Sequence, residues 1–383
     1  MSWSLIRLGD IAIFRNGINF GKESYGKGVS LIGVSDFKNR FYPDYETLDE
    51  VKESVVGVND YLDYGDIVFV RSNGNKELVG RCMLINSTQP KVTYSGFCIR
   101  TRIKDRTEHD SIFWTYHFKN ISFRKAMAGN AIGTNIQNLS QGMLSNYEAE
   151  VPDYNTQRRI ASILVTYDDL IENNQKQINL LEEAAQRLYK EWFIDLRFPG
   201  HENVEIINGF PVEWEYLEFL NIAPIITGKK DANFGSENGK YLFFTCSQQP
   251  LLAESYSYDC DAVILAGNGD FNVKLYRGKF EAYQRTYVLS PYKIEHLYLL
   301  FYTIKNRMNY LIQGASGSTI KFLTKGMIAD IKVLVPTCEI LNQYNEIAES
   351  LQSKLEALIY QNKLLTEARD RLLPKLMSGE IEV

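Results

Sequence analysis

The sequence has few of the residues that build disulfide frameworks or zinc sites. Its five cysteines are scattered over 383 residues, and no two of them form a Cys-x-x-Cys pair. An odd number of scattered cysteines argues for a reducing compartment and against a disulfide scaffold or a structural zinc site. The four histidines, which are His109, His117, His201 and His296, are equally isolated. We therefore expect that the chain holds no metal.

Long apolar runs and targeting signals are also missing. No run approaches the roughly 18 apolar residues of a membrane-spanning helix, and the N-terminal residues do not resemble a signal peptide. We therefore expect a cytoplasmic protein that does not contact a membrane. With 45% hydrophobic residues and only 10 prolines, the composition is typical of a folded chain, and the length suits two to three domains.

The net charge of −5 is distributed unevenly. Residues 1–150 contain 18 Lys and Arg against 17 Asp and Glu, and residues 205–335 contain 13 of each. The segments 151–204 and 336–383 contain 6 against 9 and 5 against 8, so they carry the whole negative excess. A neutral segment can still present a basic face, because charges act within a Debye length of about 8–10 Å. The charge balance therefore neither supports nor excludes DNA binding.

An internal repeat decides the expected architecture. A shift of 184 positions places residues 133–192 on residues 317–376, with 16 identities in 60 positions. Two further alignments lie upstream. At a shift of 195, Asp66, Val68, Asn73 and Gly74 match Asp261, Val263, Asn268 and Gly269. At a shift of 211, Trp3, Ile11, Ala12 and Gly17 match Trp214, Ile222, Ala223 and Gly228. Three alignments in the same order indicate a duplication.

The two acidic segments have the pattern of long helices. Their apolar residues alternate at spacings of three and four, which is the period of a coiled-coil seam. The seam is predicted to consist of Ile160, Leu164, Tyr167, Ile171, Ile178, Leu181 and Leu188 in the first segment, and of Leu351, Leu355, Leu358, Leu365 and Leu372 in the second. Asn174 and Asn362 fall on the same seam, where a polar residue can fix the register. We expect residues 198–200 to end the first helix, and Pro374 with Gly379 to end the second.

Antiparallel packing of these helices within the chain would bury both apolar stripes. The alternatives are that each helix packs on its own globular part, or that helices pair between chains. In the globular parts we expect strands at residues 66–70, 94–102, 262–265 and 280–289, with helices at 112–128 and 294–312. The predicted fold class is α+β: two mixed α/β domains joined by two long antiparallel coiled-coil helices, with a pseudo-two-fold internal repeat. The predicted boundaries are 1–150, 151–200, 201–335 and 336–383.

Two segments approach catalytic motifs without completing them. Residues 21–28 nearly form a phosphate-binding loop, but Gly28 replaces the Ser or Thr that would bind Mg²⁺. Pro43-Asp44 and Glu50-Val51-Lys52 resemble a nuclease set, but they lie in a charged stretch and have no counterpart in the second copy. We expect a surface loop at the first segment and a solvated loop at the second. We therefore expect no catalytic residues in this chain; a nucleotide-binding enzyme would depend on Lys27.

The turns of both copies carry side chains suited to DNA. Arg can pair with guanine, Asn or Gln with adenine, and Lys, Ser or Thr with phosphate, although Asn also simply forms turns. The candidates in the first copy are Arg15, Asn16, Arg71, Asn73, Asn75, Lys76, Arg81, Asn135 and Gln137. The candidates in the second copy are Lys229, Lys230, Asn268, Asn272, Lys274, Gln284, Arg285, Ser318, Thr319 and Lys321. The copies share framework residues and differ in these loops, which predicts that they read two different half-sites.

Several segments resemble one known family. Arg-Ile-Ala-Ser-Ile-Leu at 159–164, Trp-Phe-Ile-Asp at 192–195 and Arg-Asp-Arg-Leu-Leu-Pro-Lys-Leu-Met-Ser-Gly-Glu-Ile at 369–381 resemble the spacer-helix motifs of type I restriction–modification specificity subunits. Leu-Gly-Asp-Ile-Ala at 8–12 resembles the start of that family's target recognition domain. The second copy departs from the pattern twice. It has Leu341 where Gln157 stands in the first copy, and Leu-Glu-Phe-Leu at 217–220 where Leu-Gly-Asp would be expected.

The resemblance implies a non-catalytic, DNA-binding specificity subunit. Each recognition domain would read one half of a bipartite, asymmetric site in double-stranded DNA, and the helices would set the spacer between the halves. Two modification subunits, which are adenine-N6 methyltransferases using S-adenosylmethionine, would dock along the helices. Restriction subunits, where present, would use ATP and Mg. The chain itself would bind none of these cofactors. The alternative is a coiled-coil adaptor whose two domains bind protein partners and not DNA.

Overall fold

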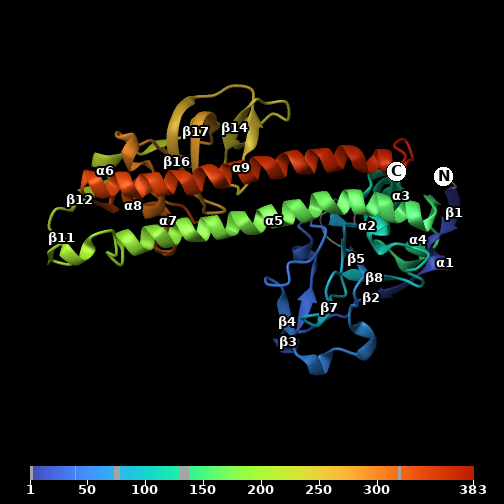
Figure 1. Ribbon diagram of the computed structural model, residues 1–383. Helices are drawn as coiled ribbons and strands as arrows, with labels where there is room; N and C mark the ends of the chain where they lie inside the picture. The colour runs from blue at the N-terminus through green and yellow to red at the C-terminus, as the bar shows by residue number, and fades with distance from the viewer. Residues whose placement is uncertain (1–2, 39, 73–77, 130–137, 318–320) are drawn as a thin grey trace. The chain divides into compact units, whose positions relative to one another are not determined.

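The computed structural model describes residues 3–38, 40–72, 78–129, 138–317 and 321–383 (Figure 1). It divides into two compact units. Unit 1 consists of Met1–Gln175 with Tyr360–Val383, and unit 2 consists of Lys176–Ile359. Each unit contains one globular domain and a part of each of two long helices, so residues far apart in the sequence complete each unit.

The long helices are α5 (Tyr154–Phe193) and α9 (Cys338–Met377), with 40 residues each. Asp153 caps α5, because its side chain accepts a hydrogen bond from the Thr156 amide at 3.1 Å. The expectation that residues 198–200 end α5 is wrong, since the helix ends five residues earlier. Leu196 adopts a left-handed conformation with φ of 54° just beyond this end, and Phe198 is buried in the core of unit 2.

The C-terminal end of α9 also differs from the prediction. Pro374 lies inside α9 and does not end it. A proline removes one helical hydrogen bond, but the last turn is held by Leu373, Leu376 and Met377, which are buried in the core of unit 1. Gly379 follows with φ of 74°, in the left-handed region that glycine adopts readily after a helix.

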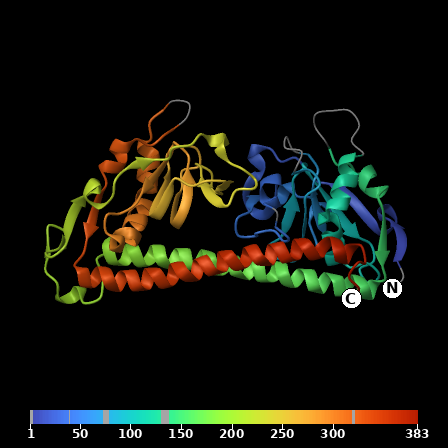
Figure 2. The ribbon, with the colours of Figure 1, turned by 90° about the horizontal axis from the view of Figure 1, so that it is seen from above.

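The two helices pair within the chain in antiparallel orientation. In unit 1, Asp168 pairs with Arg369, and the side chain of Asn174 donates to Gln361 at 3.0 Å. Positions that rise along α5 therefore meet positions that fall along α9, and Figure 2 shows the two helices side by side. In unit 2 the Trp192 and Tyr344 rings lie 5.9 Å apart. The predicted intramolecular, antiparallel pairing is confirmed.

The predicted seam residues lie as follows. Ile160, Leu164 and Ile178 are buried. Half-buried are Tyr167, Ile171, Leu181, Leu188, Leu351, Leu355, Leu358, Leu365 and Leu372. Of the two seam asparagines, Asn174 is buried, and Asn362 is half-buried and donates to the Ile171 carbonyl at 3.3 Å. Both polar side chains therefore have partners on the opposite helix.

The globular domain of unit 1 has two sheets and a group of helices. Its four-stranded sheet has the order β2 (Ala12–Asn16), β8 (Cys98–Ile103), β5 (Ile67–Val70), β6 (Cys82–Leu84). Its three-stranded sheet has the order β4 (Asp49–Val51), β3 (Tyr25–Ile32), β7 (Val92–Tyr94). β1 (Trp3–Arg7) pairs with β9 (Glu148–Pro152), and the helices are α1 (Leu8–Ile11), α2 (Ser111–Lys119), α3 (Ile121–Gly129) and α4 (Gln141–Ser145). β5 is buried on both faces, because Ile67 and Phe69 join the core that includes α2, while Val68 and Val70 join a second core.

The globular domain of unit 2 repeats this plan around one larger sheet. The strand order is β13 (Ile226–Thr227), β18 (Thr286–Leu289), β16 (Tyr258–Ala266), β17 (Val273–Ala282), β14 (Tyr241–Phe244), β15 (Leu251–Ala253). β12 (Glu215–Glu218) pairs with β19 (Lys332–Val335), and the helices are α6 (Phe219–Ile222), α7 (Leu297–Gly314) and α8 (Lys325–Ala329). A small hairpin, β10 (Ile206–Ile207) with β11 (Phe210–Pro211), follows α5. Short 3-10 helices lie at Lys22–Ser24, Val34–Phe37, Glu53–Val55, Val58–Asp60, His201–Asn203, Ala232–Phe234 and Ile294–His296.

The two departures from the family pattern leave the local structure of the second copy intact. Phe219 begins α6 where Leu8 begins α1, and both side chains are fully buried. In the first copy the buried Gln157 side chain donates to the Pro152 carbonyl at 2.9 Å and accepts from the Asp110 amide at 3.1 Å. Leu341 occupies the equivalent position in the second copy as a buried apolar residue. In the second copy, apolar packing of Leu341 therefore replaces the hydrogen bonds that Gln157 makes in the first copy.

The structure confirms two of the repeat alignments and corrects the third. Gly17 and Gly228 occupy equivalent places, because a Cβ on either would lie 2.2 Å from a carbonyl oxygen, that of Ser95 or of Tyr283. The shift of 195 for β5 and β16 is wrong by one residue. Val70 pairs with Cys98, and Ala266 pairs with Thr286 in the equivalent ladder, so the shift is 196. A shift of one residue turns strand side chains to the opposite face, and Asn268 therefore corresponds to Ser72.

Several predicted elements are divided or extended. The strand predicted at 94–102 is two strands, β7 and β8, in different sheets, and the strand predicted at 280–289 is β17 and β18 with a turn between them. The helix predicted at 112–128 is interrupted at Asn120, whereas residues 294–312 form a short 3-10 turn continuing into α7. The two expected loops are partly wrong, because Tyr25 begins β3 and residues 49–51 form β4. None of the helices that the structure describes combines the length and apolarity needed to cross a lipid bilayer.

Candidate nucleic-acid interface

Three backbone segments meet at one edge of the domain in unit 1. They are residues 71–72 after β5, the turn 95–97 between β7 and β8, and Asn138; we call their meeting point the first junction. The Arg71 amide donates to the Phe97 carbonyl at 2.8 Å, and Ser72 forms an isolated antiparallel bridge with Asn138. The Leu139 amide donates to the Arg71 carbonyl at 2.9 Å. Backbone hydrogen bonds therefore hold the three segments together.

Two side chains of the first junction are exposed, and the third, Arg71, is half-buried. The Arg71 guanidinium donates to the Gly96 carbonyl at 3.3 Å, while Phe97 is 57% exposed and Asn138 is exposed. An exposed phenylalanine beside an arginine and an asparagine combines an apolar contact with two kinds of hydrogen-bonding group. Such a set suits the edges of nucleic-acid bases.

The other predicted residues of the first copy lie in different settings. Arg15 and Asn16 are on β2, and Arg15 is engaged in an ion pair with Asp60 at 2.8 Å. Arg81 is half-buried, and its carbonyl accepts from the Val70 amide at 2.8 Å. Asn73, Asn75, Lys76, Asn135 and Gln137 lie outside the residues that the structure describes. Of the four candidates in this copy that the structure describes, only Arg71 is a member of the first junction.

The domain of unit 2 has an equivalent second junction. It consists of Gly267 and Asn268 after β16, the turn 283–285 between β17 and β18, and Phe322. The Gly267 amide donates to the Arg285 carbonyl at 2.9 Å, Asn268 forms an antiparallel bridge with Phe322, and the Leu323 amide donates to the Gly267 carbonyl at 2.8 Å. Gln284 and Arg285 are exposed, and Phe322 is 39% exposed. This junction brings three predicted residues together: Asn268, Gln284 and Arg285.

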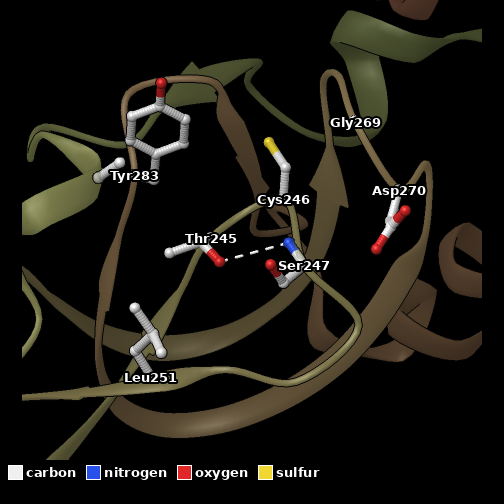
Figure 3. Close-up of a pocket in the computed structure, with 8 residues that line it drawn as sticks. Thr245, Cys246, Ser247, Leu251, Gly269, Asp270 and Tyr283 are labelled. Atoms are coloured by element: carbon white, nitrogen blue, oxygen red, sulfur yellow. Dashed lines mark hydrogen bonds between the residues drawn. The ribbon is translucent and has the colours of Figure 1, made fainter. Parts of the chain in front are cut away.

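A hollow of about 430 Å³ adjoins the second junction (Figure 3). It is lined by Ala232, Thr245, Cys246, Ser247, Leu251, Gly269, Asp270 and Tyr283. The Cys246 thiol donates to the Arg285 carbonyl at 3.5 Å, which joins the wall of the hollow to the junction. Hydroxyl, thiol and carboxylate groups therefore face an open space beside exposed Arg285.

Two predicted DNA-binding residues instead support this wall. The Asn272 side chain donates to the Cys246 carbonyl at 3.1 Å, and the Lys274 ammonium donates to the Ser247 carbonyl at 3.0 Å. Burial lowers the pKa of Lys274 below its usual range. The Asn272 and Lys274 side chains therefore fix the backbone of residues 246–247, which line the hollow.

Three further candidates of unit 2, which are Lys229, Lys230 and Lys321, lie next to segments of the second junction. Lys229 lies over the Tyr258 ring, and Lys230 lies over the Phe234 ring with its nitrogen 4.4 Å from the centroid. The Lys230 carbonyl accepts from the Gln284 amide at 2.9 Å. Lys321 is exposed beside Phe322, whereas Ser318 and Thr319 lie outside the described residues.

Sequence reasoning missed Phe97 and Phe322. A phenylalanine in a single sequence is normally assigned to the core, and this chain has 20 of them. The only signal was positional, because Asn138 and Phe322 are matched by the shift of 184 and lie at the start of the strongest alignment. In the parts of the chain that the structure covers, no three His, Cys, Asp or Glu side chains gather as a metal site.

A tyrosine ties each domain to its helix pair. In unit 1 the Tyr116 hydroxyl of α2 donates to Asp168 of α5, which also pairs with Arg369 of α9. In unit 2 the Tyr298 hydroxyl of α7 donates to Glu349 of α9 at 2.8 Å, and Arg277 of β17 pairs with the same carboxylate at 2.7 Å. Burial raises the pKa of both tyrosines, and the hydrogen bond from Arg277 lowers the pKa of Glu349 to about 2. Each domain is thus positioned on its helices by a tyrosine, a carboxylate and an arginine.

The outer faces of the helices retain a second repeated feature. Leu180, Glu183, Ala184 and Arg187 are identical to Leu364, Glu367, Ala368 and Arg371 at the shift of 184. Ala368 is half-buried and the other seven side chains are exposed, with Leu180 at 64% and Leu364 at 46%. Spacings of three and four place each set on one helix face. We call the two sets the repeated stripes.

Comparison with known proteins agrees with this architecture. The family model of the type I restriction modification DNA specificity domain matches the chain twice, at residues 2–183 and 211–368. The EcoDI specificity subunit of Escherichia coli is 36% identical over 178 residues, which cover 45% of this chain and 39% of that protein, so this match spans less than half of the relative. The MjaIX specificity subunit of Methanocaldococcus jannaschii is 26% identical over 327 residues, covering 77% of this chain and 74% of the relative.

A solved structure shows the same fold. The crystal structure of a type I restriction-modification system S subunit from M. genitalium matches with a TM-score of 0.62 at 17% identity, covering 98% of this chain and 96% of that one. Specificity subunits are the non-catalytic components of type I systems. With both copies matched by the family model, the chain belongs to the type I restriction–modification specificity subunits.

Proposed function

We propose that the chain reads a bipartite, asymmetric DNA site, with one half read by each recognition domain. The observation that carries this proposal is the pair of junctions, where equivalent backbone hydrogen bonds hold different exposed side chains. Equivalent frames would approach DNA in the same way, and different side chains would favour different bases. A duplication with divergent contact residues therefore favours an asymmetric site.

The helix pair would serve as a spacer and as a docking surface. We propose that one modification subunit, an adenine-N6 methyltransferase, docks on each repeated stripe. The exposed leucines Leu180 and Leu364 support this role, because a large apolar residue retained on both outer faces favours a protein partner over solvent. Two identical stripes would bind two copies of the same partner. The acidic balance of the helix segments also favours protein over phosphate.

The chemistry would then reside in the partners. We propose that the modification subunits use S-adenosylmethionine, that restriction subunits, where present, use ATP and Mg, and that this chain contributes recognition alone. The complex would act in the cytoplasm, on double-stranded DNA and without a membrane.

Binding to duplex DNA tests the proposal against the alternative of a protein-binding adaptor. The chain would be assembled with its modification subunits and titrated with a pool of random duplexes at 50 and 200 mM salt. Phosphate contacts release counterions, so a complex that makes 6–10 such contacts should lose about 10³–10⁵ in affinity over this range. Sequencing of the bound pool should return two short motifs at a fixed separation. An assembled complex that retains no duplexes, or retains them without any sequence preference, would support the adaptor.

A further inference from the structure

The two junctions correspond residue by residue. The amide of residue 96 donates to the Ile18 carbonyl, and the amide of residue 284 donates to the Lys230 carbonyl. The Cys98 amide donates to the Ser95 carbonyl. In the same way, the Thr286 amide donates to the Tyr283 carbonyl. The shift of 188 that relates these turns places Phe97 and Arg285 at the same position.

The other two segments correspond in the same way. The bridge between Ser72 and Asn138 matches the bridge between Asn268 and Phe322, at shifts of 196 and 184. The amides of Leu139 and Leu323 donate to the carbonyls of Arg71 and Gly267, which are related by the same two shifts. These four pairs of equivalent backbone contacts fix the alignment without reference to side chains.

Both junctions carry an arginine, a phenylalanine and an asparagine, but on different segments. In the first junction, Arg71 comes from the segment after β5 and Phe97 from the turn between β7 and β8. Asn138 is the third member. In the second junction the same three segments supply Asn268, Arg285 and Phe322. A lone exposed phenylalanine needs no explanation. The same three residue types occur on equivalent backbone segments but are distributed differently among them. This indicates that both junctions bind the same kind of partner with a different order of contacts.

We infer that Phe97 and Phe322 are specificity-determining residues, each acting in a trio with the arginine and asparagine of its junction. The inference rests on the proposed function, since it assigns the bases that the two junctions favour. Arginine pairs with the N7 and O6 of guanine, asparagine with the N6 and N7 of adenine, and an apolar side chain contacts the methyl group of thymine. The two half-sites would therefore use the same kinds of contact in a different order.

The exposure of the two rings fits a contact with DNA. Phe97 is 57% and Phe322 is 39% exposed, although phenylalanine normally gains free energy by leaving water. The Arg71 side chain donates to the Gly96 carbonyl next to Phe97, and the Phe322 backbone exchanges two hydrogen bonds with Ser316, at 2.8 and 3.1 Å. The rings are thus presented on backbone that is fixed before any DNA arrives.

Randomised half-sites provide the test. The complete complex with modification subunits would be incubated with a duplex pool in which each half-site is randomised, and the bound sequences would be counted. Phe97→Ala should reduce the preference for thymine at one position of the first half-site by about tenfold, which corresponds to about 1.4 kcal/mol. Phe322→Ala should have the same effect in the second half-site only. Phe97→Leu should keep most of the preference, because leucine still offers an apolar contact.

Two matched controls and one exchange sharpen the result. Tyr64→Ala and Tyr310→Ala remove exposed aromatic rings, at 60% and 69% exposure, that lie outside the junctions. They should leave both half-sites unchanged. Phe97→Arg gives the first turn the residue of the second, and it should replace the thymine preference with one for guanine at the affected position.

The outcomes separate this inference from the proposed function. If the unmodified complex selects no half-sites, the proposed function fails. If it selects two half-sites but Phe97→Ala changes no position, or weakens binding equally for all sequences, Phe97 is not a base reader and the inference is overturned. Melting temperatures of the variants within about 2 °C of the unmodified chain would show that loss of preference does not arise from unfolding.

Discussion

Asp168 on α5 and Arg369 on α9 form an ion pair inside unit 1, where their side chains are only 8% and 15% exposed. Tyr116 donates to the same carboxylate from the recognition domain. The equivalent positions of the second copy are Gln352 and Ala185, so this tie has no counterpart there. In unit 2 the carboxylate that accepts from the tyrosine of the recognition domain is Glu349, which lies three residues before Gln352.

Asp168→Ala should destabilise unit 1. The substitution removes the acceptor of the buried Tyr116 hydroxyl and one of the two carboxylates that pair with Arg369, while Asp370 remains beside the guanidinium. The free energy of unfolding should fall by about 2 kcal/mol, mainly because the Tyr116 hydroxyl is left buried without a partner. Gln352→Ala at the equivalent position removes a side chain whose bond to Glu356 is exposed, and it should change stability by less than about 0.5 kcal/mol. Urea unfolding of both variants measures the difference. Equal effects would show that the ion pair does not hold the helices and the domain together.

His117 should make the stability of unit 1 depend on pH. Burial lowers its pKa to about 4, and its ring pairs with the Tyr147 hydroxyl at 2.8 Å. The unfolded chain takes up this proton near pH 6.5, so between pH 6.5 and 4 the unfolded state holds more protons and stability falls as the pH falls. The loss should reach about 1 to 2 kcal/mol at pH 5. His117→Gln should flatten this part of the pH profile, and an unchanged slope in urea titrations would show that other groups cause it.

The repeated stripes should each hold one modification subunit. Leu180→Asp or Leu364→Asp places a charge on one stripe, and each variant should assemble with a single modification subunit; the double variant should assemble with none. Leu170→Asp is the matched control, because Leu170 is 44% exposed on α5 but has lysine, Lys354, at the equivalent position. Mass measurement of the purified complexes counts the subunits. Full assembly of the double variant would contradict the docking assignment.

The length of the helix pair should set the distance between half-sites. Removing one heptad from each helix, residues 172–178 and 357–363, leaves both repeated stripes in place and shortens the pair by about 10 Å at 1.5 Å per residue. The spacer should shorten by about 3 base pairs, at 3.4 Å per base pair, while both half-sites remain readable. Removing residues 172–178 from α5 alone should also change the spacer. Methylation mapping that returns the original spacer for both deletions would rule out the helix pair as the determinant of spacing.

The long helices and the duplication could be predicted from the sequence for a physical reason. A seam such as that of Ile160, Leu164 and Ile178 repeats over several heptads, and burying two such stripes in one chain favours an antiparallel pair. The helix ends were harder to place, because Pro374 is tolerated where three buried neighbours hold the last turn. Tertiary packing decides such positions, and periodicity does not record it.

The junctions could not be predicted, because they depend on strand pairing. Tyr94 and Cys98 are both buried, so residues 94–102 look like one apolar strand; only the pairing shows that the chain turns at Ser95 and enters another sheet. The same pairing corrected the repeat by one residue. It also showed that Phe97 in the first copy and Arg285 in the second copy occupy equivalent positions. Arg71, Asn268 and Arg285 were found from residue chemistry alone, whereas the exposed phenylalanines needed the fold.

Methylome sequencing would show which DNA sites this chain selects for methylation. A host lacking other adenine methyltransferases would express this chain with its modification subunits, and methylated adenines would be mapped across the genome. We expect one bipartite motif with two different halves, a fixed spacer, and one methylated adenine in each half. A symmetric motif, a single undivided motif, or the same methylation in cells that express the modification subunits without this chain would contradict this expectation.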